Sequence, residues 1–545
     1  MNVQMSLLSL AIVSGLAMSG SADAAGNQRA AAIARADALI AAPAANAAIR
    51  RADADSFVAR DAVVDADGTE HVRYQRSYRG LPVIGGDFVV HARNGKVAGV
   101  SQSLKTASRP LLKPQVSVDQ AIVEAGSRFG SHFQGAPSSR LVVYARGASP
   151  VLAHEVVFRG IKADQTETVM HYFVDARSGK ILDQWDDVKT AQPGPGGGGC
   201  SGATAAVGTG KSLTEGNVTL NTTKCGSSYQ MVDLTRGGGA THNMSMKTAG
   251  MGAVFTGTTN IWGNNLVGNA QTAAADAHYG VAATWDYYKN VHGRLGIAND
   301  GKGAISRVHY GRNYGNASWS DACFCMTFGD GDNGATILPL VALDIAGHEM
   351  SHGVTSRSAD LVYSGESGGL NEATSDIFGT MVEYYANNSN DPGDYVVGEE
   401  LFANNANMRK AIRWMFKPSL EGAGTSQDCY GPTTGSVDVH YSSGVANHFY
   451  YLLAEGAVVP AGFGAGTWAN LSPAALVCNG NTAITGIGRD AAQKIWYKAL
   501  TAYMTSSTNY AGARAATISA STDLYGASSA QTNAVKAAWS AVNVN

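Results

Sequence analysis

The sequence has few charged residues and no long hydrophobic run. Asp, Glu, Lys and Arg make up 15% of its 545 residues, against roughly 25% in an average soluble protein. Beyond Ala24 no segment offers about 18 uninterrupted apolar residues, so we expect no membrane-spanning helix in the mature chain. Lys and Arg form no cluster and do not alternate with aromatic residues, which argues against nucleic-acid binding. Little charge and 65 Gly are typical of an extracellular enzyme.

The leader at 1–24 contains no Lys or Arg, yet it otherwise resembles a signal peptide. A short apolar stretch at 7–18 precedes the small-residue sequence Ala22-Asp23-Ala24. That stretch is too short to span a bilayer stably. We therefore expect 1–24 to direct secretion and to be removed, which would make the product extracellular.

Cysteine is absent before Cys200. All six cysteines lie from that point on, and no C-x-x-C pair suggests a metal site. An even number in the later part of an exported chain favours disulfides. Six cysteines allow 15 pairings, and their order suggests Cys200–Cys225, Cys323–Cys325 and Cys429–Cys478.

The strongest break in composition is a Pro/Gly linker at 191–199, which is an exposed place for a cut. Residues 25–197 hold 21 Lys and Arg against 17 Asp and Glu, whereas 198–545 hold 19 against 25. Opposite net charges favour association of the two parts. We expect the first part to be a prosegment that assists folding and blocks the active site until it is cleaved.

Hydrophobic periodicity predicts an α+β prosegment made of two modules, at 25–110 and 111–190. Helical patterns cover 30–48 and 116–129, and strand patterns cover 72–104 and 151–185. Beyond the linker, 200–355 is mainly strand- and Gly-rich and 356–545 is mainly helical. Long helical patterns cover 273–291, 341–355, 371–386, 443–455, 489–504 and 530–542. The predicted fold is therefore α+β, with a β-rich lobe, a helical lobe and a metal motif between them.

The motif His348-Glu349-Met350-Ser351-His352 predicts a metal site. Residues four apart on a helix share a face, so both imidazoles can bind one ion, with Glu349 beside it as a base. Glu372 lies in the next helical pattern after His352 and offers a third ligand. Three protein ligands and an open position are typical of catalytic zinc, whereas structural zinc closes the fourth position.

An isolated H-E-x-x-H also arises by chance in long chains. The downstream Glu372, the aliphatic segment 340–345 and the export signal favour the zinc site over that alternative. Zinc polarises its bound water and the scissile carbonyl, and Glu349 would pass the water's proton to the leaving amine. The predicted function is a secreted zinc metalloendopeptidase, made as a zymogen, that hydrolyses proteins.

Residues 348–376 closely resemble the thermolysin family of metallopeptidases, in its thermolysin, pseudolysin and vibriolysin branches. The resemblance continues at 276–296, in YGNASW at 314–319 and at 437–454, so that it covers nearly all of 200–545. Residues 72–104 resemble the fungalysin/thermolysin propeptide motif, and about 115–189 resemble a PepSY domain. The resemblance implies a two-lobed catalytic domain behind an inhibitory propeptide.

The resemblance also implies residue roles. His348, His352 and Glu372 match the zinc ligands, and Glu349 matches the general base. The other matched positions are Tyr363 and His440 as stabilisers of the transition state, Asp438 as the carboxylate that orients His440, Asn371 and Asp376 as partners of the imidazoles, Asn316 and Ala317 as a strand edge that pairs with substrate, and Arg413 as a ligand of the substrate carbonyl.

Calcium and an apolar specificity pocket are implied in the same way. At least one calcium ion would be bound by Asp344, Glu383, Asp394 and Glu399, although the loop 387–400 is longer than its thermolysin counterpart. Cleavage before bulky apolar residues is implied by pocket walls that could equally be core: Ile337, Leu340, Ile345, Val397 and Ile412. The Cys323-Phe-Cys325 insertion is a further departure from the family, near the substrate edge.

Two rival functions are distinguishable from the endopeptidase by sequence. A metallo-aminopeptidase would carry a G-x-M-E-N-type motif, which this chain lacks. A catalytically dead binding scaffold would have lost Glu349 or a zinc ligand, and all are present. The segment before the linker could be a binding module instead of an inhibitor. We expect protein or peptide substrates, no nucleic acid or membrane partner, and a monomer.

Overall fold

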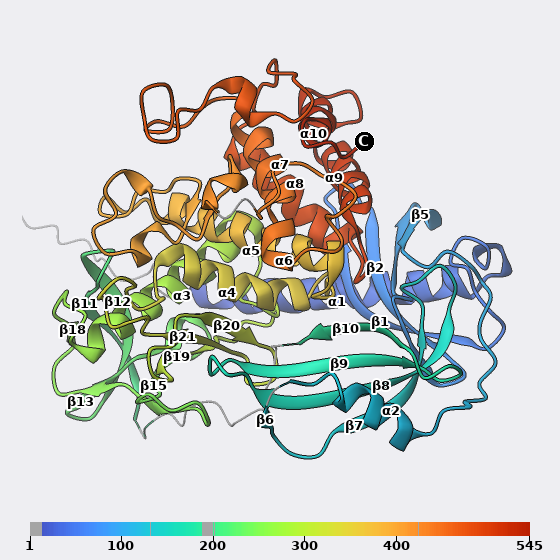
Figure 1. Ribbon diagram of the computed structural model, residues 1–545, viewed down its shortest axis with the longest axis horizontal. Coiled ribbons are helices and arrows are strands. Elements are labelled where there is room, and N and C mark those ends of the chain that lie inside the picture. The colour runs from blue at the N-terminus through green and yellow to red at the C-terminus, as the bar shows by residue number, and fades with distance from the viewer. Residues whose placement is uncertain (1–12, 131, 188–199, 201, 423–424) are drawn as a thin grey trace, which may run out of the picture. The chain divides into compact units, whose positions relative to one another are not determined.

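The computed structural model describes residues 13–130, 132–187, 200, 202–422 and 425–545 (Figure 1). The chain divides into two compact units, one of Met1–Leu112 with Val142–Val151 and one of Lys113–Leu141 with Leu152–Asn545. The larger unit therefore holds most of the second expected prosegment module together with the expected catalytic region. Residues 1–12 of the predicted signal peptide and the predicted linker lie outside the described residues. Among the described helices, none is both long and apolar enough to cross a membrane.

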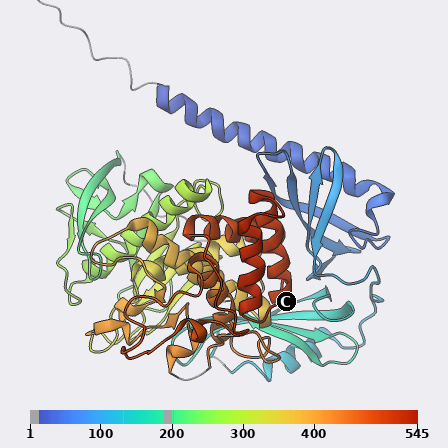
Figure 2. The same ribbon diagram turned by 90° about the horizontal axis from the view of Figure 1, so that it is seen from above.

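The smaller unit is an antiparallel sheet covered by one helix. Helix α1 (Val13–Ala41) lies along the strands in Figure 2 and packs Ala32, Ala36 and Ile40 against them. The helix predicted over 30–48 ends at Ala41, because Pro43 starts the short helix η1 (Pro43–Ala45) instead of continuing α1. The strands confirm the alternating pattern: β1 (Asp55–Val64), β2 (Glu70–Tyr78), β3 (Leu81–Ile84), β4 (Phe88–Arg93) and β5 (Lys96–Gln102).

The larger unit begins with helix α2 (Val118–Gly126), which packs on an antiparallel sheet. A capping box between Ser117 and Gln120 closes the start of α2, and Ala121 and Ala125 pack against Phe158 in the sheet. A turn at residues 176–180 joins the last two strands. The strands of this region are β6 (His132–Phe133), β7 (Ser138–Tyr144), β8 (Val151–Ile161), β9 (Glu167–Asp175) and β10 (Ile181–Asp186).

The β-rich lobe contains two sheets and helix α3 (Ala270–His292). One sheet has the order β17-β13-β12-β11-β18, and the other has the order β14-β15-β19-β21-β20 with β16 beside β15, so β20 (Ala317–Ser320) is an edge strand. The other strands are β11 (Thr204–Lys211), β12 (Asn217–Cys225), β13 (Ser228–Gln230), β14 (Val232–Asp233), β15 (Gly239–Asn243), β16 (Ala253–Val254), β17 (Thr256–Gly257), β18 (Ile261–Gly263), β19 (Ile305–Tyr310) and β21 (Cys325–Gly329).

The helical lobe follows, and it confirms the predicted change from strands to helices. Its helices are α4 (Leu343–Ser356), α5 (Gly365–Ala386), α6 (Val439–Ser442), α7 (Gly444–Glu455), α8 (Arg489–Lys498), α9 (Tyr510–Tyr525) and α10 (Ala530–Ala541), and the pair β22 (Val396–Val397) and β23 (Arg413–Trp414) lies between α5 and α6. The periodicity did not predict helix α9. Its buried face consists largely of small residues such as Ala513, Ala516 and Ala520, which give a weak apolar period.

All three expected disulfides are present: Cys200–Cys225, Cys323–Cys325 and Cys429–Cys478. The first closes the end of strand β12 onto the start of the lobe. The third joins the segments before α6 and α8. Both close short stretches of chain within one lobe, so order along the chain was sufficient to suggest the pairs.

Helices α4 and α5 pack closely because each has a glycine at the contact. A Cβ atom added to Gly379 would lie 2.5 Å from the carbonyl oxygen of Asp344, and one added to Gly347 would lie 2.9 Å from the Cα of Gly379. Neither distance leaves room for a side chain. This close approach brings one face of α5 against the H-E-x-x-H face of α4.

We expect Gly379→Ala to lower the melting temperature by several degrees. In a helix with free space, Gly→Ala stabilises by about 1 kcal/mol, whereas overpacking costs about 1–3 kcal/mol, so the sign of the change tests the close contact. Thermal unfolding followed by circular dichroism measures it. An unchanged or higher melting temperature would show that α4 and α5 can separate without cost.

Candidate active site

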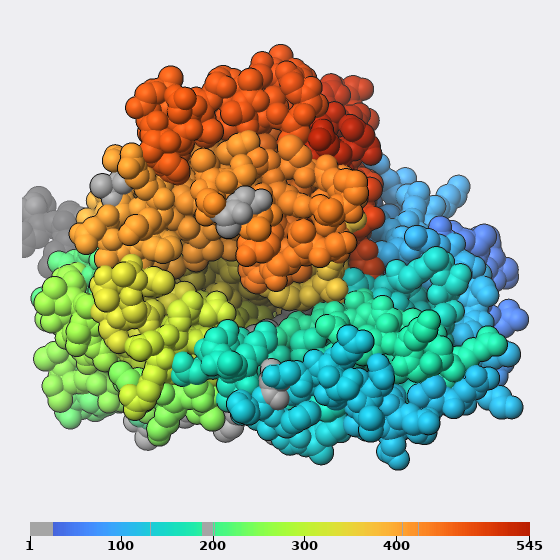
Figure 3. All heavy atoms as spheres, in the orientation of Figure 1, coloured from blue at the N-terminus to red at the C-terminus, as the bar shows by residue number. Residues whose placement is uncertain are grey.

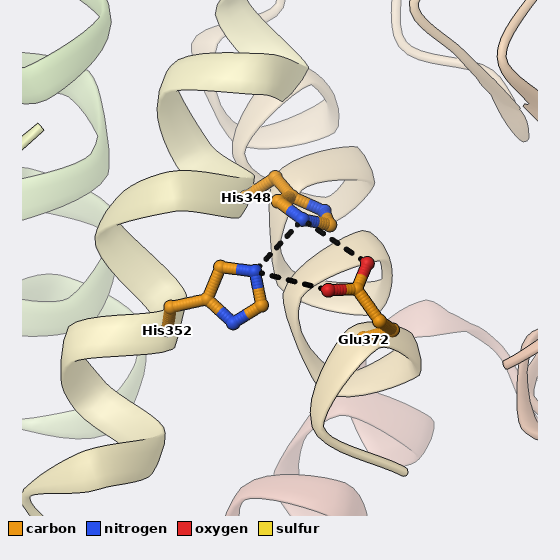
Figure 4. A group of neighbouring side chains, drawn as sticks. All are labelled: His348, His352 and Glu372. Carbon is orange, nitrogen blue, oxygen red and sulfur yellow. Dashed lines mark hydrogen bonds and ion pairs between the residues drawn. The ribbon is translucent and has the colours of Figure 1, made fainter. Parts of the chain in front are cut away.

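Two histidines of α4 and one glutamate of α5 converge on one point (Figure 4). The Nε2 atoms of His348 and His352 are 3.0 Å apart. The two oxygens of the Glu372 carboxylate lie 3.5 Å from these nitrogens, one facing each ring. The predicted triad is therefore assembled, with His348 and Glu372 buried.

Hydrogen bonds on the far side of each ring fix how the rings face this point. The Nδ1 atom of His348 is 2.8 Å from Asp376 Oδ1, and Nδ1 of His352 is 2.8 Å from Asn371 Oδ1. The Asn371 side-chain amide donates in turn to the Leu361 carbonyl, so its oxygen is the atom that faces His352. Both Nδ1 atoms are then donors, and both Nε2 atoms direct lone pairs inward.

The convergent groups fit a zinc ion. The two Nε2 atoms face each other at 3.0 Å, and Glu372 Oε2 is buried with no hydrogen-bond donor among the described residues. Burial opposes ionisation of Glu372, but His440, His352 and His348 outweigh it and lower its pKa to about 2. Two imidazoles and a carboxylate form the ligand set of a catalytic zinc site.

Glu349 lies beside His348 on α4 and lines the same cleft. Its side chain is almost fully buried. Burial raises the pKa of Glu349 to about 7, although the neighbouring His348 acts in the opposite direction. A carboxyl group with a pKa near neutrality can both accept and return a proton.

A second group of polar side chains lines the same cleft and faces Glu372. The Tyr363 hydroxyl donates to Glu372 and lies 3.2 Å from His440 Nε2. The other ring nitrogen of His440 is 2.7 Å from Asp438 Oδ1, and the same oxygen caps the start of α6. The hydrogen bond with His440 lowers the pKa of Asp438 to about 2. Attraction by Glu372 outweighs burial and raises the pKa of His440.

The cleft around these groups has a volume of about 1120 Å³ and is bordered by the sheet edge. Figure 3 shows the face of the protein on which it opens. Among the described strands, β20 has a hydrogen-bonded neighbour on one side only, which is β21. Asn316 and Ala317, at the start of β20, line the cleft together with Glu349.

The predicted apolar wall is only partly in the cleft. Leu340, Ile345 and Ile412 line it. Ile337 and Val397 are not among the residues that line the cleft; Ile337 bridges to Phe402, and Val397 pairs with Arg413 across β22 and β23. Both belong to apolar segments, and the spacing of apolar residues does not distinguish a pocket wall from the hydrophobic core.

Arg413 lines the cleft, but its guanidinium is held by a carboxylate. Its Nε and Nη2 atoms donate to Asp376 at 2.7 and 2.6 Å. Asp376 also accepts from the Asn447 amide at 2.7 Å. Burial opposes ionisation of Asp376, yet Arg413 and His348 lower its pKa well below the usual range. Asp376 therefore joins an imidazole ligand to two other elements, a link that the sequence did not reveal.

A separate group of carboxylates lies in the last turn of α5 and the loop after it. Glu383, Asp391, Glu399 and Glu400 each place an oxygen within 4.8 Å of the others. Burial raises the pKa of Glu383 well above the usual range, and the nearby carboxylates, Asp344 and Asp394 among them, act in the same direction. Two of the four predicted calcium ligands are thus in this group and two lie beside it. Asp391 and Glu400 were missed, although they are in the long loop 387–400.

We expect Asp376→Asn to lower zinc affinity about 10- to 100-fold, which is the usual effect of removing a partner of a ligating imidazole. The substitution keeps the shape of the side chain and removes the charge that holds His348 and Arg413. Competition with a zinc-binding dye measures the affinity. Glu366→Gln is the control, because Glu366 is on the same helix and contacts Tyr430 and Tyr510 but no imidazole. Equal zinc affinity in both variants would contradict the role of Asp376.

Three family models match the chain in order. The fungalysin/thermolysin propeptide motif matches residues 55–104, the catalytic domain of thermolysin metallopeptidases matches 207–356, and the α-helical domain of thermolysin metallopeptidases matches 359–544. The border between the last two falls at the C-terminal end of α4, between the two helices of the metal site. The likeness of residues 115–189 to a PepSY domain stays a prediction.

Known relatives extend over most of the chain. A transglutaminase-activating metalloprotease from Streptomyces mobaraensis is 45% identical over 90% of this chain, which spans 61% of that protein's length. A thermolysin from Bacillus sp. strain EA1 is 35% identical over 88% of this chain and 84% of its own. A solved precursor of protealysin from Serratia proteamaculans aligns with 56% of this chain and 87% of its own, at 26% identity and a TM-score of 0.43. The chain belongs to the thermolysin family of metallopeptidases, whose catalytic zinc the His348, His352 and Glu372 group fits.

Proposed function

We propose that this metalloendopeptidase is a secreted zymogen that cuts proteins before bulky apolar residues, with Glu349 as its general base. The observation that carries the proposal is the inward-facing His348, His352 and Glu372 group at the floor of a cleft that a free strand edge borders. The signal-like leader at 1–24 supports export.

The chemistry divides between the ion and the side chains of the cleft. Zinc bound by the triad would supply a Lewis acid for water and carbonyl oxygen. Glu349 takes a proton from the attacking water and returns it to the leaving amine, for which a pKa of about 7 is well matched. Glu349 follows His348 on α4 and would lie beside the ion as a base, not as a ligand.

Tyr363 and His440 provide the donors for the developing oxyanion. The Tyr363 hydroxyl and His440 Nε2 are 3.2 Å apart, and both face Glu372. Asp438 holds Nδ1 of His440, so Nε2 points into the cleft. The raised pKa of His440 favours its charged form, in which Nε2 is a donor.

Substrate backbone would pair with the free edge of β20, where Asn316 and Ala317 offer their polar groups. Leu340, Ile345 and Ile412 form the apolar part of the same cleft and would accept the side chain that follows the cut. Arg413 is within the cleft wall and would reach a substrate carbonyl only through the guanidinium N–H groups that Asp376 does not hold.

At least one calcium ion would occupy the buried carboxylates around Glu383 and Glu399, with Asp344 and Asp394 beside them. Hard cations take oxygen ligands of this kind. The ion would hold the loop after α5 and support the fold, some distance along α5 from Glu372.

The position of the prosegment's second part, within the larger unit, supports an inhibitory role. Lys162, Gln184 and Asp186 line the catalytic cleft together with Glu349. The turn between β8 and β9 is fastened to the segment before β20: the Gln165 side chain donates to Arg312 O at 2.7 Å and accepts from Arg312 N at 2.9 Å. A bound prosegment would therefore exclude substrate from the edge strand. We expect the released enzyme to act as a monomer.

We expect Glu349→Gln to abolish hydrolysis of casein while zinc content stays at one ion per chain, because the amide cannot accept the proton. Loss of a general base lowers the reaction rate by at least about 10²- to 10⁴-fold. Atomic absorption and a casein assay measure the two quantities on the same sample. Turnover retained at the wild-type rate would contradict the assignment of Glu349 as the base.

We expect Gln165→Ala to raise the peptidase activity of the unprocessed chain. Two hydrogen bonds to the Arg312 backbone are lost, each worth about 1 kcal/mol, so hydrolysis of a small peptide by the precursor should rise about tenfold or more. The rate is measured before any cleavage is visible on a gel. Gln134→Ala, at an exposed position of the same prosegment, is the control and should leave the rate unchanged. Equal rates in both variants would count against inhibition by this contact.

A further inference from the structure

The turn between β20 and β21 contains a disulfide that spans a single residue. Cys323 and Cys325 are joined on either side of Phe324. The turn occupies residues 321–324, and Cys325 begins β21, where it pairs with Ser320 at the end of β20. The bridge therefore lies at the closed end of a hairpin whose outer strand, β20, borders the catalytic cleft.

Phe324 adopts a backbone conformation that the bridge can hold. Its φ is +52°, in the left-handed region that residues with a side chain rarely adopt. A residue persists in that region where its surroundings leave it no alternative. The ring closed by Cys323 and Cys325 contains the backbone of Phe324, so it supplies this restraint through covalent bonds. The carbonyl oxygen of Phe324 also accepts from Ile305 N at 3.2 Å, which ties the same residue to β19.

The Phe324 side chain packs on a tryptophan of the edge strand. The rings of Phe324 and Trp319 meet edge to face, with their centroids 5.3 Å apart. The guanidinium of Arg357, the residue that follows α4, lies 5.9 Å from the centroid of the Phe324 ring. Phe324 thus contacts both the edge strand and the end of the helix that carries two zinc ligands.

Trp319 in turn lies against that helix. A Cβ atom added to Gly353, the residue after His352, would lie 2.8 Å from the Trp319 ring. The indole Nε1 donates to Asp321 Oδ1 at 3.0 Å, and the same oxygen accepts from Ser356 Oγ in the last turn of α4 at 2.7 Å. Trp319 also lines the cleft. The edge strand and the zinc helix are therefore spaced by one indole ring.

We propose that the Cys323–Cys325 bridge is a positioning element for catalysis, which sets the edge of β20 relative to the zinc site through Phe324 and Trp319; this rests on the proposed pairing of substrate with β20. A substrate that lies along the strand gains from the bridge, because the strand is already ordered before binding. A substrate that reaches only the zinc site and the apolar wall gains nothing from it. The bridge thus favours extended chains over short peptides.

The test compares two substrates that share one scissile bond, a blocked dipeptide and an octapeptide. The full chain with Cys323→Ser and Cys325→Ser is expressed, allowed to mature and assayed with both. We expect KM for the octapeptide to rise about 5- to 30-fold, the factor that corresponds to ordering one residue of backbone. The kcat for both substrates and KM for the dipeptide should stay at the parent values.

Phe324→Ala keeps the bridge and removes the ring that packs on Trp319, so it should raise the same KM even if the serine variant does not fold. Phe324→Tyr keeps the ring and should behave as the parent. Cys200→Ser with Cys225→Ser is the matched control, because it opens a disulfide of the same lobe and neither cysteine lines the cleft. It should lower the melting temperature and leave KM for both substrates unchanged.

Asn316→Ala alters the edge of β20 and leaves the bridge and the Phe324 ring in place. It should raise KM for the octapeptide, as pairing of substrate with β20 requires. The proposal is overturned if Asn316→Ala raises that KM and either the folded serine variant or Phe324→Ala does not. It is also overturned if these two variants weaken both substrates equally, which is the result of a purely structural role. An unchanged KM in Asn316→Ala would instead refute the pairing with β20 and remove the basis of the proposal.

Discussion

Asp376 accepts hydrogen bonds from the imidazole of His348 on α4, the guanidinium of Arg413 on β23 and the amide of Asn447 on α7. Because Asp376 itself is on α5, one buried carboxylate joins four elements around the metal site. The glycine contact between α4 and α5 sets how far apart the two ligand-bearing helices stand. Within that spacing, Asp376 determines which nitrogen of His348 faces inward. The position of each remaining group in the cleft depends on this arrangement.

The zinc triad could be predicted because its information is local. Helical spacing places His348 and His352 on one face whatever surrounds them. Glu372 follows in the next helix, which packs against that face. The same holds for the disulfides, which join cysteines that are neighbours in the order of the chain. The family resemblance added Tyr363 and His440, whose spacing alone carried no signal.

The remainder depends on contacts between distant segments. The period of apolar residues does not say whether Ile337 or Val397 faces a cleft or the core; the structure pairs Ile337 with Phe402 and Val397 with Arg413. Helix α9 escaped prediction because its buried face is built from small residues. Glu215, in the turn between β11 and β12, accepts a hydrogen bond at its carbonyl oxygen from Asn388 in the distant loop after α5, and no pattern in the sequence links these two segments.

Strand β20 offers its backbone to whatever lies in the cleft. A partner that pairs with such an edge must expose the polar groups of its own main chain over several residues. In a folded protein those groups are already engaged in helices and sheets. If substrate pairs with β20 as proposed, cleavage would be governed by how often a target locally unfolds. The edge strand would then act as a sensor of conformational stability: tight domains would survive, while loosely held linkers and damaged chains would be degraded.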